Sequence, residues 1–198
     1  MEKEKLNPLS GFRDYLGDDK SQLLKLLEIL FQKSGYQSLE TPIIERQEIL
    51  LAKYGDEALK LLYRFEDNGG RKVGLRYDIT VPLARYAANN FGALTLPFKR
   101  YEIGPVFRAE RPQKGRYRQF TQADVDILGS EVGEEELLEL VSAFSDQVGI
   151  KLDLIINDRQ IVEAIMDNFE INLALRPALY RLLDKKEKIT ADLFNSEI

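Results

Sequence analysis

Two stretches of the chain, residues 97–108 and 119–128, constrain its fold most strongly, because both have the length and alternation of β-strands and they flank a polar loop. Polar side chains recur at every second position near the end of the first stretch and along the second: Arg108, Glu110, Gln122, Asp124 and Asp126. Successive side chains of a strand point to opposite faces, so the members of each set share one face. The two stretches therefore predict an antiparallel hairpin with a polar floor and a basic loop at its end.

Helices and shorter strands are predicted around this hairpin. Apolar spacing, capping residues and glycine stops predict helices over residues 19–34, 48–62 (with a break near Gly55), 80–90 (with Thr80 as a cap), 133–148, 159–168 and 174–186. Further strands are predicted over residues 37–44, 63–66, 73–77 and 151–156, with Asp67-Asn-Gly-Gly70 as the turn of a second hairpin. Helices inserted between paired strands indicate an α+β fold on a largely antiparallel sheet flanked by helices.

The composition excludes several classes of function. The chain contains no cysteine and no histidine. A disulfide scaffold, a thiolate metal site, a serine–histidine hydrolase and a zinc protease are therefore excluded, and we assign no residue as a metal ligand. The charged start of the chain lacks the apolar core of a signal peptide, and no apolar run is long enough to cross a bilayer. We therefore expect a soluble, cytoplasmic protein.

The loop between the two predicted strands, residues 109–118 (the basic loop), and Arg108 before it concentrate positive charge in an acidic chain. Five cations and one carboxylate lie between Arg108 and Arg118, whereas the formal net charge of the whole chain is -5. Such a run is usually a solvated face. Here it joins two strands whose polar faces need partners, and a nucleotide together with a small zwitterion would supply them. The local cluster therefore favours a phosphate site.

Several motifs, in this order along the chain, resemble those of histidyl-tRNA synthetases, which are class II aminoacyl-tRNA synthetases. Gly11-Phe-Arg-Asp14 resembles the N-terminal signature of that family, and the helix at 19–34 followed by Leu39-Glu-Thr-Pro42 resembles motif 1. Leu75-Arg-Tyr-Asp-Ile-Thr-Val-Pro-Leu-Ala-Arg85 resembles its amino-acid-binding segment, and Glu110-Arg-Pro-Gln-Lys-Gly-Arg-Tyr-Arg118 resembles its version of motif 2. The resemblance covers essentially the whole chain and implies a class II synthetase fold.

The resemblance implies that four residues of the hairpin hold ATP. Arg108 would be the catalytic residue, binding the α-phosphate and stabilising its charge as the carboxylate of the amino acid attacks. Glu110 would accept a hydrogen bond from the adenine amino group, Phe120 would stack on the ring, and Arg116 would reach the outer phosphates. Magnesium would enter with ATP as a substrate complex.

The resemblance also implies that Asp78, Thr80, Gln122 and Asp126 bind histidine. The carboxylates would pair with its ammonium group, and Gln122 would add a neutral hydrogen bond. Taken alone, Asp78 and Thr80 are more simply a strand end and a helix cap, and Asp126 is as readily a charge on an edge strand. No general base is needed, because the attacking carboxylate is already ionised.

The resemblance implies a histidine–tRNA ligase core over residues 1–198 that is incomplete at its C-terminal end, since none of these residues matches motif 3 or the anticodon-binding domain. We expect binding of ATP and histidine to form histidyl-adenylate and charge the acceptor end of tRNA(His), with weak or no activity from this chain alone. The segment 19–45 is expected to form a homodimer interface. One alternative is a non-catalytic, synthetase-like regulatory subunit of ATP phosphoribosyltransferase, and another is a module that binds tRNA through the basic loop.

Overall fold

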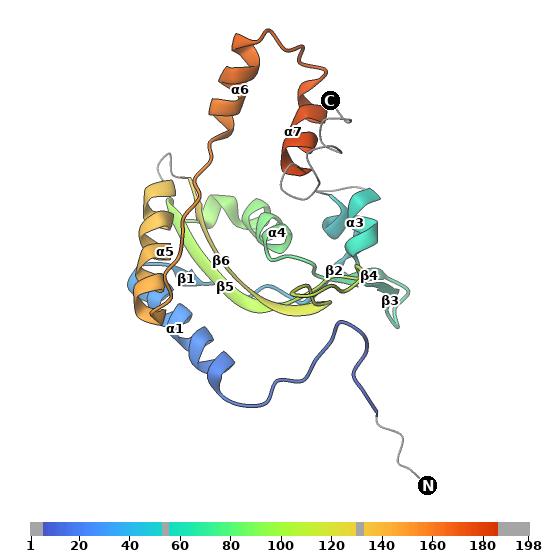
Figure 1. Cartoon of the computed structure of the whole chain (residues 1–198). Coiled ribbons are helices and arrows are strands. Elements are labelled where there is room, and N and C mark those ends of the chain that lie inside the picture. The colour runs from blue at the N-terminus through green and yellow to red at the C-terminus, as the bar shows by residue number, and fades with distance from the viewer. Residues whose placement is uncertain (1–5, 53–55, 130–132, 186–198) are drawn as a thin grey trace. The chain divides into compact units, whose positions relative to one another are not determined.

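The computed structural model describes residues 6–52, 56–129 and 133–185 (Figure 1). The elements follow in this order: α1 (Asp19–Lys33), β1 (Gln37–Ser38), β2 (Ile44–Arg46), α2 (Gln47–Leu51), α3 (Asp56–Leu61), β3 (Arg64–Glu66), β4 (Lys72–Leu75), α4 (Thr80–Asn90), the 3-10 helix η1 (Phe91–Ala93), β5 (Phe98–Phe107), β6 (Gln119–Leu128), α5 (Glu134–Val148), α6 (Arg159–Asn168) and α7 (Arg176–Lys185). They belong to two compact units, residues 1–151 and 152–198. None of the described helices is both long and apolar enough to cross a membrane.

The hairpin of β5 and β6 is the longest paired element of the first unit, and it confirms the two strands predicted from the alternation. Its paired positions run from Phe98 opposite Leu128 to Phe107 opposite Gln119. The short β1 pairs with β5 in parallel, beginning at Gln37, so the sheet order is β1-β5-β6. The main pair of this sheet is antiparallel, as predicted, and one edge is parallel.

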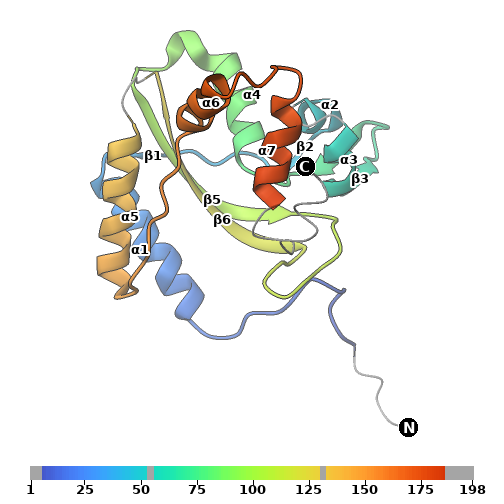
Figure 2. The same cartoon turned by 45° about the horizontal axis from the view of Figure 1, so that its top comes forward.

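One face of this sheet packs against α1 and α5, which lie side by side in both views (Figure 1, Figure 2). Leu30 and Phe31 of α1 and Leu140 of α5 are buried together with Tyr101 of β5. Complete burial of such side chains contributes roughly 1.5–3 kcal/mol each. Because the strand neighbours of Tyr101 point the other way, this contact leaves the alternate residues of the hairpin to form an opposite, polar face.

A smaller antiparallel sheet has the order β2-β4-β3, and its β3–β4 turn confirms the second predicted hairpin. The Asp67 carboxylate accepts hydrogen bonds from the backbone N–H groups of Gly69 and Arg71, at 2.9 Å each. Gly70 has a φ of 74°, which glycine adopts without the steric penalty of a Cβ. The core beside this sheet joins α2, α4 and the segments between them: Leu50, Leu62, Tyr77 and Val81.

Three predicted elements differ from the structure. The strand predicted over 151–156 is wrong, because this segment pairs with no strand of the described chain and alternation alone cannot supply a hydrogen-bonding neighbour. The strand predicted over 37–44 is interrupted around Pro42, which lacks a backbone N–H: its first two residues form β1, and its last residue, Ile44, begins the separate strand β2. The helix predicted over 48–62 is divided into α2 and α3, as its break predicts, although Gly55 itself lies outside the described residues.

The second unit contains α6 and α7 in its described part. Asp158 caps α6, because its carboxylate accepts a hydrogen bond of 2.7 Å from the Gln160 backbone. Arg176 at the start of α7 pairs with Glu163 at 2.7 Å and with Asp167 at 2.5 Å. These charge-assisted contacts link the two helices within their own unit.

Candidate functional site

A cavity of about 590 Å³ opens at the end of the β5–β6 hairpin. Its walls come from the end of α3, the β4–α4 connection, the basic loop and the start of β6. The lining residues are Leu61, Tyr77, Asp78, Arg108, Glu110, Gly115, Arg116, Tyr117 and Phe120. All four predicted ATP ligands and one predicted histidine ligand therefore line a single cavity.

Arg108 is fixed at the cavity wall by contacts on two sides. Its backbone N–H continues the hairpin by donating to the Arg118 carbonyl at 2.8 Å, and its Nε donates to the Tyr77 carbonyl at 3.2 Å. Its guanidinium carbon lies 5.0 Å from the centre of the Phe120 ring, within cation–π range. A guanidinium held in this way presents a planar fork, which matches the oxygens of a phosphate.

A tight turn brings Arg116 to the same cavity. The backbones of Gln113 and Arg116 exchange two hydrogen bonds, of 2.9 and 3.2 Å. Gly115 lies between them with a φ of 79°, a left-handed conformation that favours glycine. The turn thus adds a second cation to the cavity lining, to which Glu110 contributes a carboxylate acceptor.

Asp78 lies between β4 and α4 and faces the cavity with a largely buried side chain. Its Oδ1 accepts a hydrogen bond of 3.0 Å from the Val81 N–H, which caps α4. The prediction that Thr80 caps this helix is therefore wrong. Thr80 is already the first helical residue, whereas Asp78 has the three-residue spacing from which a side chain reaches back to an N–H at the helix start.

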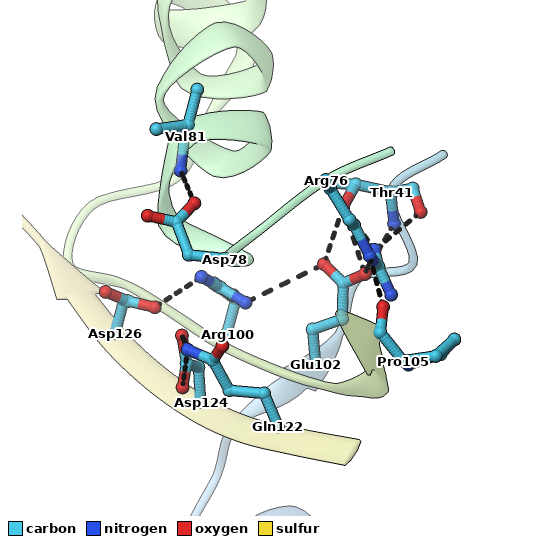
Figure 3. A network of polar contacts seen from close by, with 10 residues as sticks. All are labelled: Thr41, Arg76, Asp78, Val81, Arg100, Glu102, Pro105, Gln122, Asp124 and Asp126. Carbon is cyan, nitrogen blue, oxygen red and sulfur yellow. Dashed lines mark hydrogen bonds and ion pairs between the residues drawn. The ribbon is translucent and has the colours of Figure 1, made fainter. Parts of the chain in front are cut away.

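A buried ion network occupies the polar face of the hairpin (Figure 3). Arg100 is fully buried between Asp126, 2.5 Å from its Nη2, and Glu102, 3.8 Å from its Nη1. Glu102 also pairs with the buried Arg76. Burial raises the pKa of the Asp126 carboxyl, the Arg100 cation opposes that rise, and the Asp124 carboxylate adds to it. The predicted polar floor is thus present, but ion pairs within the protein already balance much of its charge.

Arg76 joins three segments of the first unit. Its Nη1 donates to the Thr41 carbonyl and its Nε donates to the Pro105 carbonyl, at 2.9 Å each, while the guanidinium also pairs with Glu102. A Cβ added to Gly104 would lie 2.2 Å from Nη2 of this arginine, far inside contact distance. The absence of a side chain at Gly104 therefore leaves the space that the guanidinium occupies.

The other three predicted ligand residues, Thr80, Gln122 and Asp126, lie outside the cavity lining. Gln122 donates from Nε2 to both carboxylate oxygens of Asp124, at 2.9 Å each. Its Oε1 is a buried acceptor without a hydrogen-bond donor among the described residues. Gln122 and Asp126 share the polar face of β6, four residues apart, so the hairpin brings these two predicted histidine ligands to one surface.

Several residues of this region were not predicted from the sequence as site residues. Tyr77 and Tyr117 line the cavity, and Arg76 and Arg100 build the ion network. The sequence could have indicated Arg100. It lies an even number of residues before Arg108 in the predicted strand, and such spacing places both side chains on the same face. The sequence could not have indicated Arg76, because its role depends on a pairing with a distant strand that no local pattern specifies.

Comparison with known proteins identifies relatives along nearly the whole chain. The sequence profile of the family described as histidyl-tRNA synthetase matches residues 11–197. A histidine–tRNA ligase of Wolinella succinogenes is 46% identical over 187 residues, which make up 91% of this chain and 42% of that protein. The solved histidyl-tRNA synthetase of Nostoc sp. matches with a TM-score of 0.81 and 29% identity, over 98% of this chain and 45% of that one.

A third relative shares the fold alone. The structure from Bacillus halodurans, described as an ATP phosphoribosyltransferase regulatory subunit/histidyl-tRNA synthetase, has a TM-score of 0.62 at 24% identity. That match covers 76% of this chain and 39% of the other. The chain spans less than half the length of the curated relatives it matches.

Proposed function

Because this chain belongs to the histidyl-tRNA synthetase family, we propose that it carries the ATP-binding part, and some of the histidine-binding part, of a histidine-activating site. The observation that supports this most strongly is the single cavity whose lining unites the following groups: Asp78, Arg108, Glu110, Arg116 and Phe120. Two cations, two carboxylates and an aromatic ring around one hollow suit a phosphate chain, a purine base and a small zwitterion.

The proposed reaction joins histidine to the AMP part of ATP. A carboxylate oxygen of histidine attacks the α-phosphorus and forms a P–O bond, while the bond to the β-phosphate breaks and pyrophosphate leaves. Arg108 would stabilise the charge on the α-phosphate, and Arg116 would bind the leaving phosphates. Loss of one such donor typically costs about 10²–10³ in rate. No proton has to be removed, which suits a chain without histidine.

The base of ATP would bind beside the phosphates. Glu110 would accept a hydrogen bond from the adenine amino group, and the purine would stack on the Phe120 ring, whose centre lies 5.0 Å from the guanidinium carbon of Arg108. Magnesium would arrive with ATP and be held chiefly by phosphate oxygens.

Histidine would bind toward the polar face of β6. Asp78 would pair with its ammonium group, and the buried Oε1 of Gln122 would accept an N–H that no described protein group supplies. Asp126, held by Arg100 at 2.5 Å, would offer a second carboxylate, and Thr80 a hydroxyl. The substrate would thereby complete a hydrogen-bonding surface that the protein leaves partly unsatisfied.

Further partners follow from the family. We propose that the acceptor end of tRNA(His) receives the histidyl group, that the protein acts in the cytoplasm, and that it forms a homodimer through residues 19–45. Large apolar side chains are exposed in that segment: Leu23, Ile29, Ile43 and Ile44. Such a surface suits a protein interface. Sedimentation equilibrium should show twice the 22.8 kDa chain mass, and a 22.8 kDa species at all concentrations would refute the dimer.

Titration calorimetry with ATP–magnesium and with L-histidine tests the proposed site. Arg108→Ala should weaken ATP binding by about 10- to 100-fold, the usual cost of hydrogen bonds to a charged group. Arg46→Ala is the matched control, because Arg46 is an exposed arginine whose pairing with Glu48 lies away from the cavity lining. Unchanged ATP affinity in Arg108→Ala would remove its assigned role. Failure of the unsubstituted chain to bind either ligand would refute the proposal.

Turnover is tested separately by histidine-dependent exchange of pyrophosphate into ATP, for which we expect weak or no activity from this chain alone. The two alternatives make different predictions. A regulatory subunit of ATP phosphoribosyltransferase that only senses histidine has no use for the adenine and phosphate ligands, so histidine binding without ATP binding would favour it. A module that binds only tRNA through the basic loop would bind neither small ligand.

A further inference from the structure

The N-terminal arm, defined here as residues 10–15, contacts both ends of the basic loop. The Arg118 backbone N–H donates to the Gly11 carbonyl at 2.8 Å, and its Nη1 donates to the Ser10 carbonyl at 3.3 Å. The same side chain donates from Nε to the Glu110 carbonyl at 2.9 Å. Arg118 lies at the end of the loop. Through these bonds it connects Glu110, at the beginning of the loop, with Ser10 and Gly11, which precede Arg118 by more than 100 residues in the chain.

Arg13 provides a second connection between the arm and the loop. Its guanidinium carbon lies 3.9 Å from the centre of the Tyr117 ring and 4.6 Å from that of Tyr15. Its Nη1 donates to the Tyr117 hydroxyl and its Nε to the Tyr15 hydroxyl, at 2.8 Å each. Each exposed contact of this kind is weak. The two contacts with Tyr15 orient Arg13 within the arm, and the two with Tyr117 act on one side chain of the loop.

Gly11 makes the close approach between arm and loop sterically feasible. Its φ of +85° is strained for any L side chain. A Cβ at this position would also lie 2.8 Å from Cγ of Arg118. Both the backbone conformation and the packing therefore require glycine where the arm crosses the loop.

The contacts end at the cavity, because Arg116 and Tyr117 line it and Arg118 closes the hairpin against Arg108. We propose that the arm is a clasp that holds the basic loop in its ATP-binding conformation, with Arg13 as a positioning residue that acts through Tyr117. This inference rests on the proposed ATP site. An exposed loop samples open conformations, and a ligand that binds only the closed form loses affinity in proportion to the fraction that is open.

The clasp is separate from the core that stabilises the fold. Leu9 and Leu16, which flank the arm, are exposed. Within the arm, the half-buried Phe12 lies edge-on to Tyr63, with ring centres 6.2 Å apart, and belongs to neither buried cluster of the described residues. Arg13 is itself exposed. Substitution of Arg13 should therefore leave the melting temperature of the protein unchanged, so an effect on the loop would not be an effect of unfolding.

Limited trypsin digestion of the full chain tests the clasp, because Lys114, Arg116 and Arg118 are cleavage sites within the loop. Cleavage at each site is followed by mass spectrometry, and its rate reports the open population of the loop. In Arg13→Ala, loop cleavage should be about three- to tenfold faster. Arg46→Ala, which removes the same charge from another exposed position, should cleave at the original rate. Unchanged loop cleavage in Arg13→Ala would overturn the clasp.

Calorimetry then connects the clasp to the nucleotide. In the double variant Gly11→Val, Arg13→Ala, which disrupts both connections, ATP affinity should fall at least about threefold. Faster loop cleavage combined with undiminished ATP affinity in this variant would overturn the positioning role. If the unsubstituted chain binds ATP and both variants behave like it, only the clasp fails. If the unsubstituted chain does not bind ATP, the proposed function fails first.

Discussion

Single residues in this protein are constrained by space as well as by charge. Arg76 and Arg100 bury their guanidinium groups in the polar face of the hairpin, where each has a carboxylate partner. A buried ion pair contributes little net stability, but loss of one partner leaves an unpaired charge at high cost. Gly104 adds a steric condition, because only a residue without a side chain leaves room for the Arg76 guanidinium.

Gly104→Ala should therefore destabilise the protein by about 3–5 kcal/mol, the range for breaking a buried ion pair, because the new Cβ displaces the Arg76 guanidinium. Urea unfolding measures the change. Gly92→Ala is the control, since a Cβ there meets no atom within 4 Å, and it should stay within about 0.5 kcal/mol. If Arg76 is the group displaced, Gly104→Ala should cost much less in an Arg76→Met background. An equal cost in both backgrounds would contradict the steric explanation.

Asp126 should make folding stability depend on pH in one defined window. Burial raises its pKa above the ordinary aspartate value of 3.8, so the folded protein keeps this proton to a higher pH than the unfolded chain. The resulting stabilisation is fully present below 3.8 and is lost as pH rises through the raised pKa. The free energy of unfolding of the parent chain, minus that of Asp126→Asn, should fall with pH only across this window. A difference that is flat, or that rises with pH, would contradict the buried carboxyl.

Elements that depend on local pattern were predicted well from the sequence, and those that depend on distant partners were not. The β5–β6 hairpin and helices such as α1, α4 and α6 have long periodic runs with clear ends, so local order identifies them. The segment 151–156, which is rich in leucine and isoleucine, also suits a strand in sequence but has no neighbouring strand in the described chain. The site residues follow the same rule. The predicted ATP ligands lie within one sequence motif and line one cavity. The pairing of Arg76 with Glu102 joins separate elements, so no local pattern indicates it.

At the start of α4, Asp78 combines a structural contact with a proposed ligand contact, and two substitutions separate them. Asp78→Ala should cost about 1 kcal/mol in urea unfolding, because the Val81 N–H loses its cap. Asp78→Asn should unfold like the parent chain, since asparagine caps equally well, yet it should bind histidine more weakly in calorimetry because the negative charge is gone. Parent-like histidine affinity in Asp78→Asn would leave Asp78 as a cap alone.

At the scale of the whole molecule, the candidate site lies within the first unit. Every residue that lines the cavity lies within 1–151, as do all members of the ion network. The second unit has its own capped and paired helices, α6 and α7. The sequence predicts one domain over 1–198, because its length suits a single domain and it contains no obvious linker. The division depends on which contacts form in space.

A fragment of residues 1–151 should consequently bind ATP with an affinity within about twofold of the full chain, as expected if each unit folds independently. Calorimetry on the two proteins measures this ratio. Circular dichroism of the fragment should show retained helix and strand signals, which establishes that it folds before binding is compared. Loss of ATP binding by a folded fragment would show that residues 152–198 support the cavity.

The space above Gly104 also links the evolutionary histories of separate positions. The guanidinium of Arg76 donates hydrogen bonds to the carbonyls of Thr41 and Pro105, pairs with Glu102, and occupies the space beside Gly104. A lineage that acquires a side chain at position 104 would have to shorten or replace the arginine at 76. A lineage that loses the carboxylate at 102 would have to place another acceptor beside that arginine. Substitutions at these positions should therefore become fixed in pairs. Their order should be restricted, because no intermediate sequence should leave the Arg76 guanidinium buried without an acceptor.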